Sequence, residues 1–405
     1  MAIKIRLIQP DEYEAWSRTI GTAFGEDITP EELAFYRITL ELDRAWAAVD
    51  GKAIVGCAAA YSFRLAIPGG EVPAAGVTAV GVLPSHRRRG VLRQLLGEVV
   101  DDCRARGEPV AILTASEGAI YQRFGYGLAS VRAHVEVDRS HVRFEAEGAG
   151  DGAGSLRMLD RDEALQLLPP IYERAIIPGF FRRTQDWWTT LLDDSTWRRA
   201  GAGPRHIVLN EVDGSPEGYV LYRIRGEWDH LGSKGRLEVG EIICLTPRSE
   251  LTLWKFVFSA DLVTTVRYRN APIDCPLLLQ VSEPRRLALT IGDGLWLQFI
   301  DLQAALAARS YARADSIVLE VADELPGNAG RWRLDTGEDQ VSIERTDEPA
   351  EIALAARDLA TLYLGAFSGS DLVRATRARE IVPGAAAKLD GLFATPRDPW
   401  LPGGF

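Results

Sequence analysis

The sequence of 405 residues contains few of the residues that build disulfide frameworks and metal sites. Its four cysteines, Cys57, Cys103, Cys244 and Cys275, lie far apart and form no CxxC pair. We therefore expect neither a disulfide framework nor a zinc cage, and a reducing, cytoplasmic location is the default. There are five histidines and no HExxH motif. This excludes most metal-hydrolase functions, and we expect no metal.

Long hydrophobic runs are also missing. No apolar run approaches the ~20 residues of a membrane span. The first residues, MAIKIRLIQPDEYEAW, lack the apolar core and cleavage site of a signal peptide, so we expect no membrane association. With 46% apolar and 25% charged residues, the composition is that of an ordinary globular protein. Its length predicts roughly two to four domains.

An excess of basic charge is absent as well. The 46 lysines and arginines are outnumbered by 57 aspartates and glutamates, which gives a net charge of −11. This balance argues against a nucleic-acid binder, whose phosphate contacts need a basic face. It suits the attraction of cationic small molecules, and equally the solubility of many enzymes.

The first 82 residues alternate between strand and helix signals. We expect a strand over residues 3–8 and a helix on the spacing of Tyr13, Trp16, Ile20 and Phe24. These signals are typical of a mixed α/β fold.

Capping and turn motifs mark the next elements. Thr29-Pro30-Glu31-Glu32 is a capping box that predicts a helix continuing through Phe35, Ile38 and Leu42. Asp50-Gly51 predicts a hairpin between strands over residues 45–49 and 53–60. After the turn at residues 68–70, a further strand is expected over residues 71–82.

The run Pro84-Ser85-His86-Arg87-Arg88-Arg89-Gly90 lies between that strand and a helix. The helix is predicted by one apolar stripe, formed by Val91, Leu92, Leu95, Leu96, Val99 and Val100. Free N–H groups at a helix entry bind anions, and arginines add charge-assisted hydrogen bonds that suit phosphate oxygens. Such a run is more often a solvated basic turn. The strand–loop–helix context favours a phosphate site.

Two segments carry a resemblance to a known family. VTAVGVLPSHRRRGVLRQLL, residues 77–96, resembles the acetyl-CoA signature of the GNAT N-acetyltransferases, where Q/R-x-x-G-x-G/A follows a strand ending in V-x-V. Arg87-x-x-Gly90-x-Leu92 fills the pattern, with leucine in the last place. SEGAIYQRFGYG, residues 116–127, completes a nearly end-to-end resemblance to the Eis-type (enhanced intracellular survival) aminoglycoside N-acetyltransferases.

The resemblance implies acetyl-CoA as cosubstrate and no metal. The residues that it assigns to the pyrophosphate cradle are Arg88, Arg89, Gly90, Val91, Leu92 and Arg93. The strand residues Val80, Gly81 and Val82 would pair with the pantetheine arm, and Ser116 and Glu117 would meet the cofactor through backbone groups. Ordinary buried packing also explains the two valines, and both interpretations hold together.

The resemblance also implies a general acid. Tyr121 matches the tyrosine that protonates the CoA thiolate in Eis-type enzymes. A phenol has a pKa of about 10, so it is protonated at neutral pH. Tyr126 lies five residues on and is assigned to packing. Without the resemblance, the residues do not distinguish the two tyrosines.

No His, Asp or Glu near the motif stands out as a base. The resemblance points to the α-carboxylate of Phe405, a weak base of pKa about 3.5 unless it is desolvated or acts through water. From sequence alone, a loose terminus is the more common meaning. The family often has an acidic residue just before the end, where this chain has Gly404. Glu26 and Asp27 are either contacts for a polyamine or solvated loop residues.

A second region repeats the first without its cradle. The stretch GAGDGAGS, residues 148–155, marks the boundary. Helices are expected over 161–174 and 186–192, and strands over 207–211, 218–225 and 237–246. Pro247 then takes the place of Pro84, but RSELTLWKFVF begins a helix without the arginine–glycine entry. PGFFRRTQDWW, residues 178–188, resembles a linker of Eis-type proteins, and its aromatics could equally be core or interface residues.

A third pattern begins near residue 289. We expect strands over 295–300, 316–321, 330–334 and 341–345, and helices over 301–308, 357–364 and 372–378. In the family this region is a sterol-carrier-like domain. The chain ends in ATPRDPWLPGGF, which cannot form a regular helix and would normally be frayed.

Together these patterns predict an α/β fold with mixed sheets. It would have a catalytic GNAT domain over residues 1–147, a degenerate GNAT-like domain over 155–288 and a sterol-carrier-like domain over 289–405. The predicted function is acetyl-CoA-dependent N-acetylation of polycationic small-molecule amines such as aminoglycosides. The resemblance also implies a homohexamer. The alternatives are a protein or peptide lysine acetyltransferase and a non-catalytic lipid carrier, and a carrier would need neither the cradle nor Tyr121.

Overall fold

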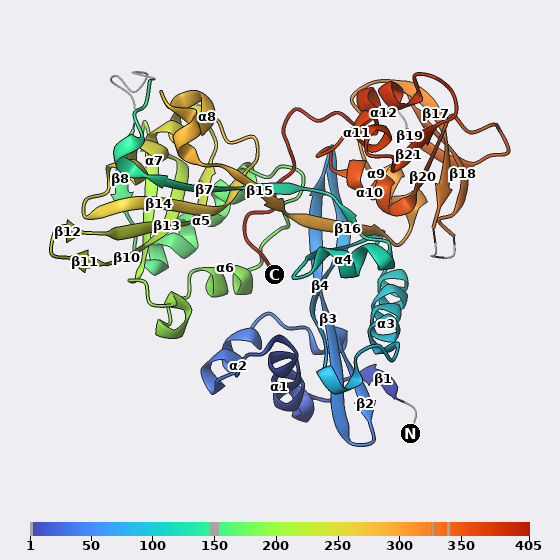
Figure 1. The fold of residues 1–405 in the computed structure, drawn as a ribbon, viewed down its shortest axis with the longest axis horizontal. Helices are drawn as coiled ribbons and strands as arrows, with labels where there is room; N and C mark the ends of the chain where they lie inside the picture. The colour runs from blue at the N-terminus through green and yellow to red at the C-terminus, as the bar shows by residue number, and fades with distance from the viewer. Residues whose placement is uncertain (1–2, 146–153, 324, 326, 338–340) are drawn as a thin grey trace. The chain divides into compact units, whose positions relative to one another are not determined.

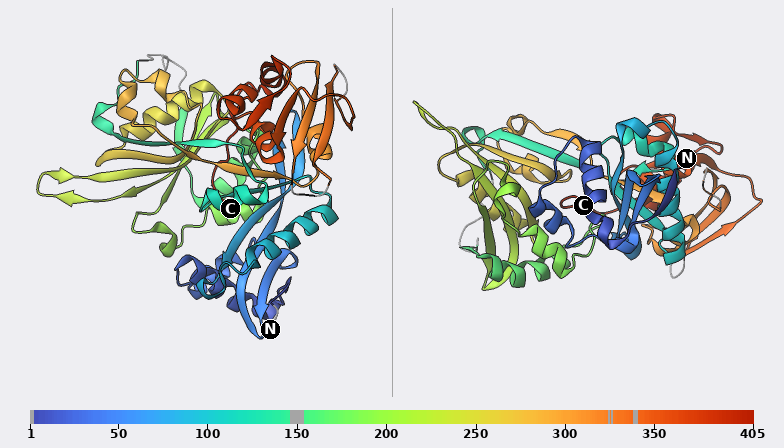
Figure 2. Two further views of the ribbon diagram at one scale, coloured as in Figure 1. Left: turned by 45° about the vertical axis from the view of Figure 1, so that its right-hand side comes forward. Right: turned by 90° about the horizontal axis from the view of Figure 1, so that it is seen from below.

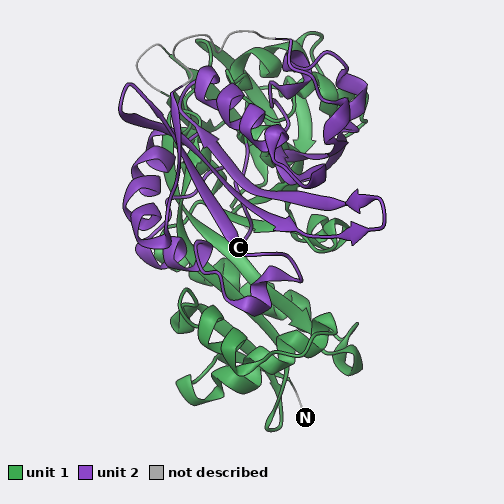
Figure 3. Cartoon of the chain, turned by 90° about the vertical axis from the view of Figure 1, so that its left-hand side faces the viewer, with its two compact units in different colours: residues 1–130, 294–399, 405 green, residues 131–293, 400–404 purple. Residues whose placement is uncertain are grey.

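The computed structural model describes residues 3–145, 154–323, 325, 327–337 and 341–405. The chain forms two compact units (Figure 3). Unit 1 comprises residues 1–130, 294–399 and 405, and unit 2 comprises residues 131–293 and 400–404. Most of the predicted boundary at residues 148–155 lies outside the described residues.

The first sheet lies in unit 1 and has the strand order β1-β2-β3-β4-β5-β16-β6 (Figure 1). Neighbouring strands are antiparallel except β4 and β5, which are parallel. The strand bounds are β1 Lys4–Leu7, β2 Ala45–Asp50, β3 Ala53–Ile67, β4 Gly70–Val82, β5 Val110–Thr114, β16 Leu295–Phe299 and β6 Gly127–Leu128.

Two helices cover opposite faces of this sheet. Successive strand residues point to opposite faces, so Ala47 and Cys57 pack in one cluster with Trp16 of α1 (Tyr13–Phe24). Ala48 and Ala58 pack on the other side with the apolar stripe of α3 (Val91–Arg106). Figures 1 and 2 show α3 lying along the long β3–β4 hairpin. The predicted helix stripe is therefore confirmed as a core-facing stripe.

Helix α2 (Pro30–Tyr36) has the predicted capping box. The Thr29 hydroxyl accepts from the Glu32 amide at 3.3 Å, and the Glu32 carboxylate accepts from the Thr29 amide at 2.7 Å. The prediction that this helix runs on to Leu42 is wrong, because Leu42 begins a separate 3₁₀ turn. Ile38 and Thr39 follow the helix, and β-branched residues are poor helix formers.

The second sheet lies in unit 2 and has the order β15-β7-β14-β13-β10-β9-β8. The strand bounds are β15 Thr290–Asp293, β7 Val131–Asp138, β14 Val263–Pro272, β13 Gly235–Cys244, β10 Ser215–Arg225, β9 Arg205–Val212 and β8 Ser155–Met158, with a small hairpin of β11 Trp228–Asp229 and β12 Gly232–Ser233. The helix bounds are α5 Arg161–Arg174, α6 Gln185–Leu191, α7 Pro247–Ser259 and α8 Leu277–Gln280. The order of β9, β10, β13 and α7 repeats that of β2, β3, β4 and α3, as the sequence predicts.

Aromatic residues of the 178–188 segment belong to the core of unit 2. Phe180, Phe181 and Trp188 are each 2% exposed. Of the two interpretations that the sequence left open, the structure selects core packing for these three residues.

Two strands pair across the predicted domain boundaries. β7 lies before residue 147, yet it pairs with β14 and β15 of the second sheet. β16 lies after residue 289, yet it pairs with β5 and β6 of the first sheet. These pairings are between segments far apart in the chain, so local sequence patterns do not reveal them.

The third sheet also lies in unit 1, with the order β19-β18-β17-β20-β21. The bounds are β17 Asp315–Ala322, β18 Gly330–Thr336, β19 Val341–Arg345, β20 Ile352–Ala355 and β21 Ala378–Glu380, with helices α9 Leu302–Ala308, α10 Ala356–Tyr363, α11 Gly369–Arg374 and α12 Ala385–Phe393. The predicted helix over 372–378 is wrong at its end. Thr376 adopts a left-handed backbone (φ 59°), which stops α11 and leads into β21.

The chain end is ordered rather than frayed. Trp400 is 4% exposed and Leu401 is 3% exposed, and both belong to unit 2. Across the described part of the chain, no helix is long and apolar enough to cross a bilayer.

Candidate active site

The first sheet opens along its parallel strand pair. β4 and β5 pair from Ala74↔Val110 to Gly76↔Ile112, and β4 then continues to Val82. Ala79 has a left-handed backbone (φ 50°), next to a shift in the β3–β4 register. Such a bulge bends and twists a strand. The last residues of β4 thus leave β5 and form one wall of a pocket.

The loop after β4 leads into helix α3, whose N-terminus has no capping side chain. A 3₁₀ turn over Pro84–His86 leads to Arg88 and Gly90, whose φ angles are 61° and 79°. Gly90 is the N-cap of α3 and has no side chain that could accept from the first-turn amides. The atom nearest to a Cβ built on Gly90 is Gln94 Nε2, at 4.0 Å. The helix entry is therefore open to an anion.

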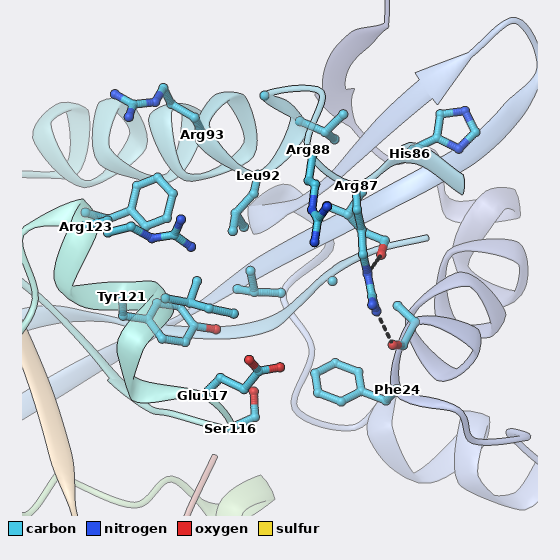
Figure 4. A pocket seen from close by; sticks show the side chains of 18 residues that line it. Phe24, His86, Arg87, Arg88, Leu92, Arg93, Ser116, Glu117, Tyr121 and Arg123 are labelled. Atoms are coloured by element: carbon cyan, nitrogen blue, oxygen red, sulfur yellow. Dashed lines mark hydrogen bonds between the residues drawn. The ribbon is translucent and has the colours of Figure 1, made fainter. Parts of the chain in front are cut away.

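Arg87 fastens this loop to the rest of the domain. Its guanidinium donates to the carbonyl of Val82 at 3.3 Å and to the carbonyl of Ala23 at 3.2 Å, as Figure 4 shows. The sequence pattern places Arg87 in the motif but does not reveal these two carbonyl contacts. Arg87 and Arg88 both line the pocket, whereas Arg89 does not, so the three arginines of this run have different surroundings.

The pocket at this opening has a volume of about 820 Å³. Its lining comes from the end of α1, the end of β4, the α3 entry and the segment around α4 (Gly118–Tyr121). The predicted site residues that line it are Val80, Gly81, Val82, Arg88, Gly90, Val91, Leu92, Arg93, Ser116, Glu117 and Tyr121. Arg89 is exposed and is not in the lining.

Tyr121 lines the pocket. Figure 4 shows its hydroxyl directed toward the space bordered by Leu92, Arg88 and Glu117. The side chain is 7% exposed, and burial, followed by the charge of Glu117, raises the pKa of Tyr121 above its ordinary value. Tyr121 can thus keep its proton to a higher pH than a free tyrosine.

Other lining residues were missed by the sequence reasoning. Ile120, Arg123 and Phe124 lie in α4 and the 3₁₀ turn that continues it, within the segment already singled out. Arg123 and Phe124 lie three and four positions after Ile120, a spacing that places them on one face of a helix, and this was the signal that could have revealed them. Phe24 comes from the end of α1, and only the tertiary fold brings it to the pocket.

Phe405 packs beside the point where the first sheet opens. Its ring lies 5.0 Å from the Phe63 ring and 6.5 Å from the Tyr61 ring, centroid to centroid. A Cβ on Gly76, the last β4 residue paired with β5, would lie 3.2 Å from the Phe405 ring and 2.2 Å from that of Phe63. Glycine at position 76 leaves room for both aromatic rings.

No group of three or more His, Cys, Asp or Glu side chains that could hold a metal ion was found among the described residues. The polar groups that line the pocket are arginines, helix amides, the Glu117 carboxylate, the Tyr121 phenol and the His86 imidazole.

Comparisons with known proteins agree with this geometry. Two family models described as acetyltransferase (GNAT) domain match residues 4–129 and 179–294. A sterol carrier protein domain model matches residues 302–402. These matches confirm the predicted architecture of two GNAT domains followed by a sterol-carrier-like domain.

Relatives of similar length match the whole chain. An uncharacterized N-acetyltransferase of Streptomyces avermitilis is 38% identical over 410 residues, covering 100% of both chains. The N-acetyltransferase Eis of Mycobacterium bovis is 34% identical over 398 residues, covering 95% of both. The crystal structure of Eis1 from Mycobacterium abscessus superposes with a TM-score of 0.85 at 32% identity, covering 99% of this chain and 100% of that one. The chain is an N-acetyltransferase, and it belongs to the Eis-type family of GNAT acetyltransferases.

Proposed function

We propose that this enzyme transfers the acetyl group of acetyl-CoA to primary amines of polycationic small molecules, with aminoglycosides as the substrate class. The observation that carries the proposal is the pocket of unit 1, in which the bare α3 entry, Arg88 and the Tyr121 hydroxyl face one space. The net charge of −11 favours the approach of polycations.

The cradle residues would hold the CoA pyrophosphate. The α3 amides and Arg88 offer donors to its oxygens, and Arg87 keeps the loop in shape through its two carbonyl contacts. The unpaired side of β4 near Val80 and Val82 offers backbone groups to the pantetheine amides. A fixed cradle lowers the entropy cost of bringing the thioester to the amine.

The chemistry needs one proton donor and one proton acceptor. The amine nitrogen attacks the thioester carbonyl carbon, the C–S bond breaks, and the departing sulfur takes the Tyr121 proton. Before the attack the ammonium loses one proton to the α-carboxylate of Phe405, directly or through water. The second proton that the nitrogen loses, as the amide forms, passes through water to the Tyr121 phenolate and restores the acid. The packing of Phe405 against Phe63 beside the sheet opening supports this role.

An acceptor panel tests the proposal. Purified enzyme and acetyl-CoA would be incubated with aminoglycosides, polyamines and lysine peptides, and CoA thiol release would be followed with a thiol reagent. We expect release that depends on aminoglycoside, with acetylated product confirmed by mass. Release with lysine peptides alone would favour a peptide acetyltransferase, and no release with any of these acceptors would contradict the proposed acceptor class.

The family resemblance also leads us to propose a cytoplasmic homohexamer. Light scattering of the purified chain would test the assembly, and a mass of one or two subunits would contradict it.

A further inference from the structure

The second sheet opens at the same place as the first. β13 and β14 pair in parallel up to Val239↔Tyr268, and β13 then continues to Cys244. Val239 lies eight residues before Pro247, and Gly76 lies eight residues before Pro84. The parallel pairing therefore ends at equivalent points in the two repeats.

The chain's own C-terminal segment is bound at this second opening. Asn270 lies on β14, two residues beyond the last pair, and its side-chain amide donates to the Leu401 carbonyl at 2.9 Å. The Trp400 indole donates to the Asn270 carbonyl at 3.1 Å, and the Trp400 amide donates to the Pro178 carbonyl at 2.9 Å.

A buried ion pair holds the next residue of the tail. Glu241 lies on β13, also two residues beyond the last pair, and it accepts from Arg183 at 2.9 Å and 2.5 Å. Their side chains are 3% and 4% exposed. Arg183 has a further donor contact at 2.7 Å, to the carbonyl of Pro402. Breaking such a pair would leave a buried charge unpaired, so the geometry of Arg183 is firmly fixed.

The surroundings of the ion pair fix the guanidinium further. It lies 4.1 Å over the Tyr172 ring and 5.1 Å over the Trp188 ring, and the Tyr219 hydroxyl donates to Glu241 at 2.6 Å. All of these side chains belong to unit 2. Two aromatic rings and the Glu241 carboxylate therefore hold the Arg183 guanidinium, whose Nη2 also donates to the tail.

Gly179 shows how closely the backbone of unit 2 approaches the tail. It has a left-handed backbone (φ 98°), and a Cβ on it would lie 2.8 Å from the Trp400 carbonyl oxygen. The residue before the aromatic pair is therefore required to be small, and Phe180 then packs against Trp400 with ring centroids 5.6 Å apart.

We propose that the opening of the second sheet is a docking site for residues 400–402, and that Arg183 and Asn270 are positioning residues for the C-terminal carboxylate. This inference rests on the proposed role of Phe405 as the base. Only two residues, Gly403 and Gly404, separate Pro402 from Phe405, and an extended chain spans at most ~3.6 Å per residue. Fixing Pro402 therefore limits the positions that the terminal carboxylate can reach.

The test compares two asparagines of unit 2. Asn270→Ala removes the bond to Leu401. Asn210→Ala changes another asparagine of unit 2, a buried one whose 3.4 Å contact to the Ser155 carbonyl lies away from the tail. Arg183→Lys is the second tail variant, since lysine keeps the charge beside Glu241 but lacks the forked donor. Thermal melts establish that each full-length variant is folded.

Two readouts separate positioning from general stability. Release of Phe405 by a carboxypeptidase, followed by intact mass, should be about tenfold faster or more in Asn270→Ala and Arg183→Lys. In the same variants kcat should fall between about 10-fold and 100-fold, as for a misplaced catalytic group, while the KM for acetyl-CoA stays within about twofold. Asn210→Ala should match the wild type in both.

The outcomes distinguish this inference from the proposed function. If deletion of Phe405 abolishes activity while Asn270→Ala and Arg183→Lys keep wild-type kcat and protease protection, docking is overturned and the terminal base stands. If deletion of Phe405 leaves full activity, the base and the positioning role are both overturned. Equal losses in Asn210→Ala would also overturn the positioning role, because they would show a structural effect alone.

Discussion

Tyr121 and Tyr126 meet edge to face, with ring centroids 5.9 Å apart and planes at 76°. Their environments differ in one respect that matters for catalysis. Tyr121 lines the pocket, whereas Tyr126 is 1% exposed and lies outside the lining. Burial raises the pKa of Tyr126 well above its ordinary value. The sequence alone could not separate the two phenols, and the pocket lining supports our proposal that Tyr121 donates the proton while Tyr126 packs in the core.

Tyr121→Phe should therefore lower kcat by about 10²–10⁴-fold, because the ring and its packing remain while the transferable proton is lost. The KM for acetyl-CoA should change little. Steady-state kinetics with a saturating acceptor would measure both values. Tyr126→Phe is the matched control and should stay near the wild-type rate. A collapse in Tyr126→Phe with full activity in Tyr121→Phe would mean that the two roles are exchanged.

The charge of Glu117 provides a test through pH. The general acid works while it is protonated, so kcat should fall as the pH rises through the Tyr121 pKa. Burial is the first cause that raises this pKa, and the Glu117 charge is the second. Glu117→Gln removes the second cause only, so the basic limb of the kcat profile should move to lower pH. An unchanged limb would show that it belongs to another group.

Arg88 and Arg89 should differ in their effect on the cosubstrate. Arg88 lines the pocket and Arg89 does not, so Arg88→Ala should raise the KM for acetyl-CoA more than Arg89→Ala. A charge-assisted hydrogen bond is worth about 1.5–3 kcal/mol, or roughly a 10-fold to 100-fold change. Arg18→Ala, at an exposed arginine paired with Glu14 on α1, is the control. Unchanged acetyl-CoA affinity in a folded double variant would disprove the cradle.

Acetyl-CoA should bind once per chain. In the second repeat, the Thr246 hydroxyl caps α7 by accepting from the Ser249 amide at 3.2 Å. The same hydroxyl donates to Glu217 at 2.7 Å. In the first repeat, α3 begins at Gly90, which has no side chain to cap it. In the second repeat, the Thr246 hydroxyl already caps α7 and lies beside the Glu217 carboxylate, whose negative charge disfavours anion binding. Titration calorimetry should give one tight site, and two equivalent sites would contradict the prediction.

Local patterns predicted the parts of the fold that short-range physics controls. The capping box at Thr29, the Asp50-Gly51 hairpin and the apolar stripe of α3 all depend on residues within a few turns of one another. The end of α2 and the start of β21 were mispredicted. The apolar spacing continues past both helix ends. α2 ends just before the β-branched Ile38, and α11 ends just before the left-handed backbone of Thr376.

The rest of the site depends on contacts between distant segments. The placement of β16 between β5 and β6, and the contact of Arg87 with Ala23, join residues far apart in the chain. Most of the residues that line the pocket were predictable because they lie in the two motif segments, residues 77–96 and 116–127. Phe24 and the anchoring of Trp400 were not, since neither has a local signature.

The central claim is that Tyr121 and the terminal carboxylate carry the proton transfers. The most direct measurement uses protein ligation to make the full chain with a C-terminal carboxamide, so that every side chain, including Phe405, is kept and only the negative charge is lost. The account predicts that kcat falls by about 10²-fold or more, that the KM for acetyl-CoA is unchanged and that the acidic limb of the pH–rate profile disappears. A carboxamide enzyme with the wild-type kcat and pH profile would contradict it.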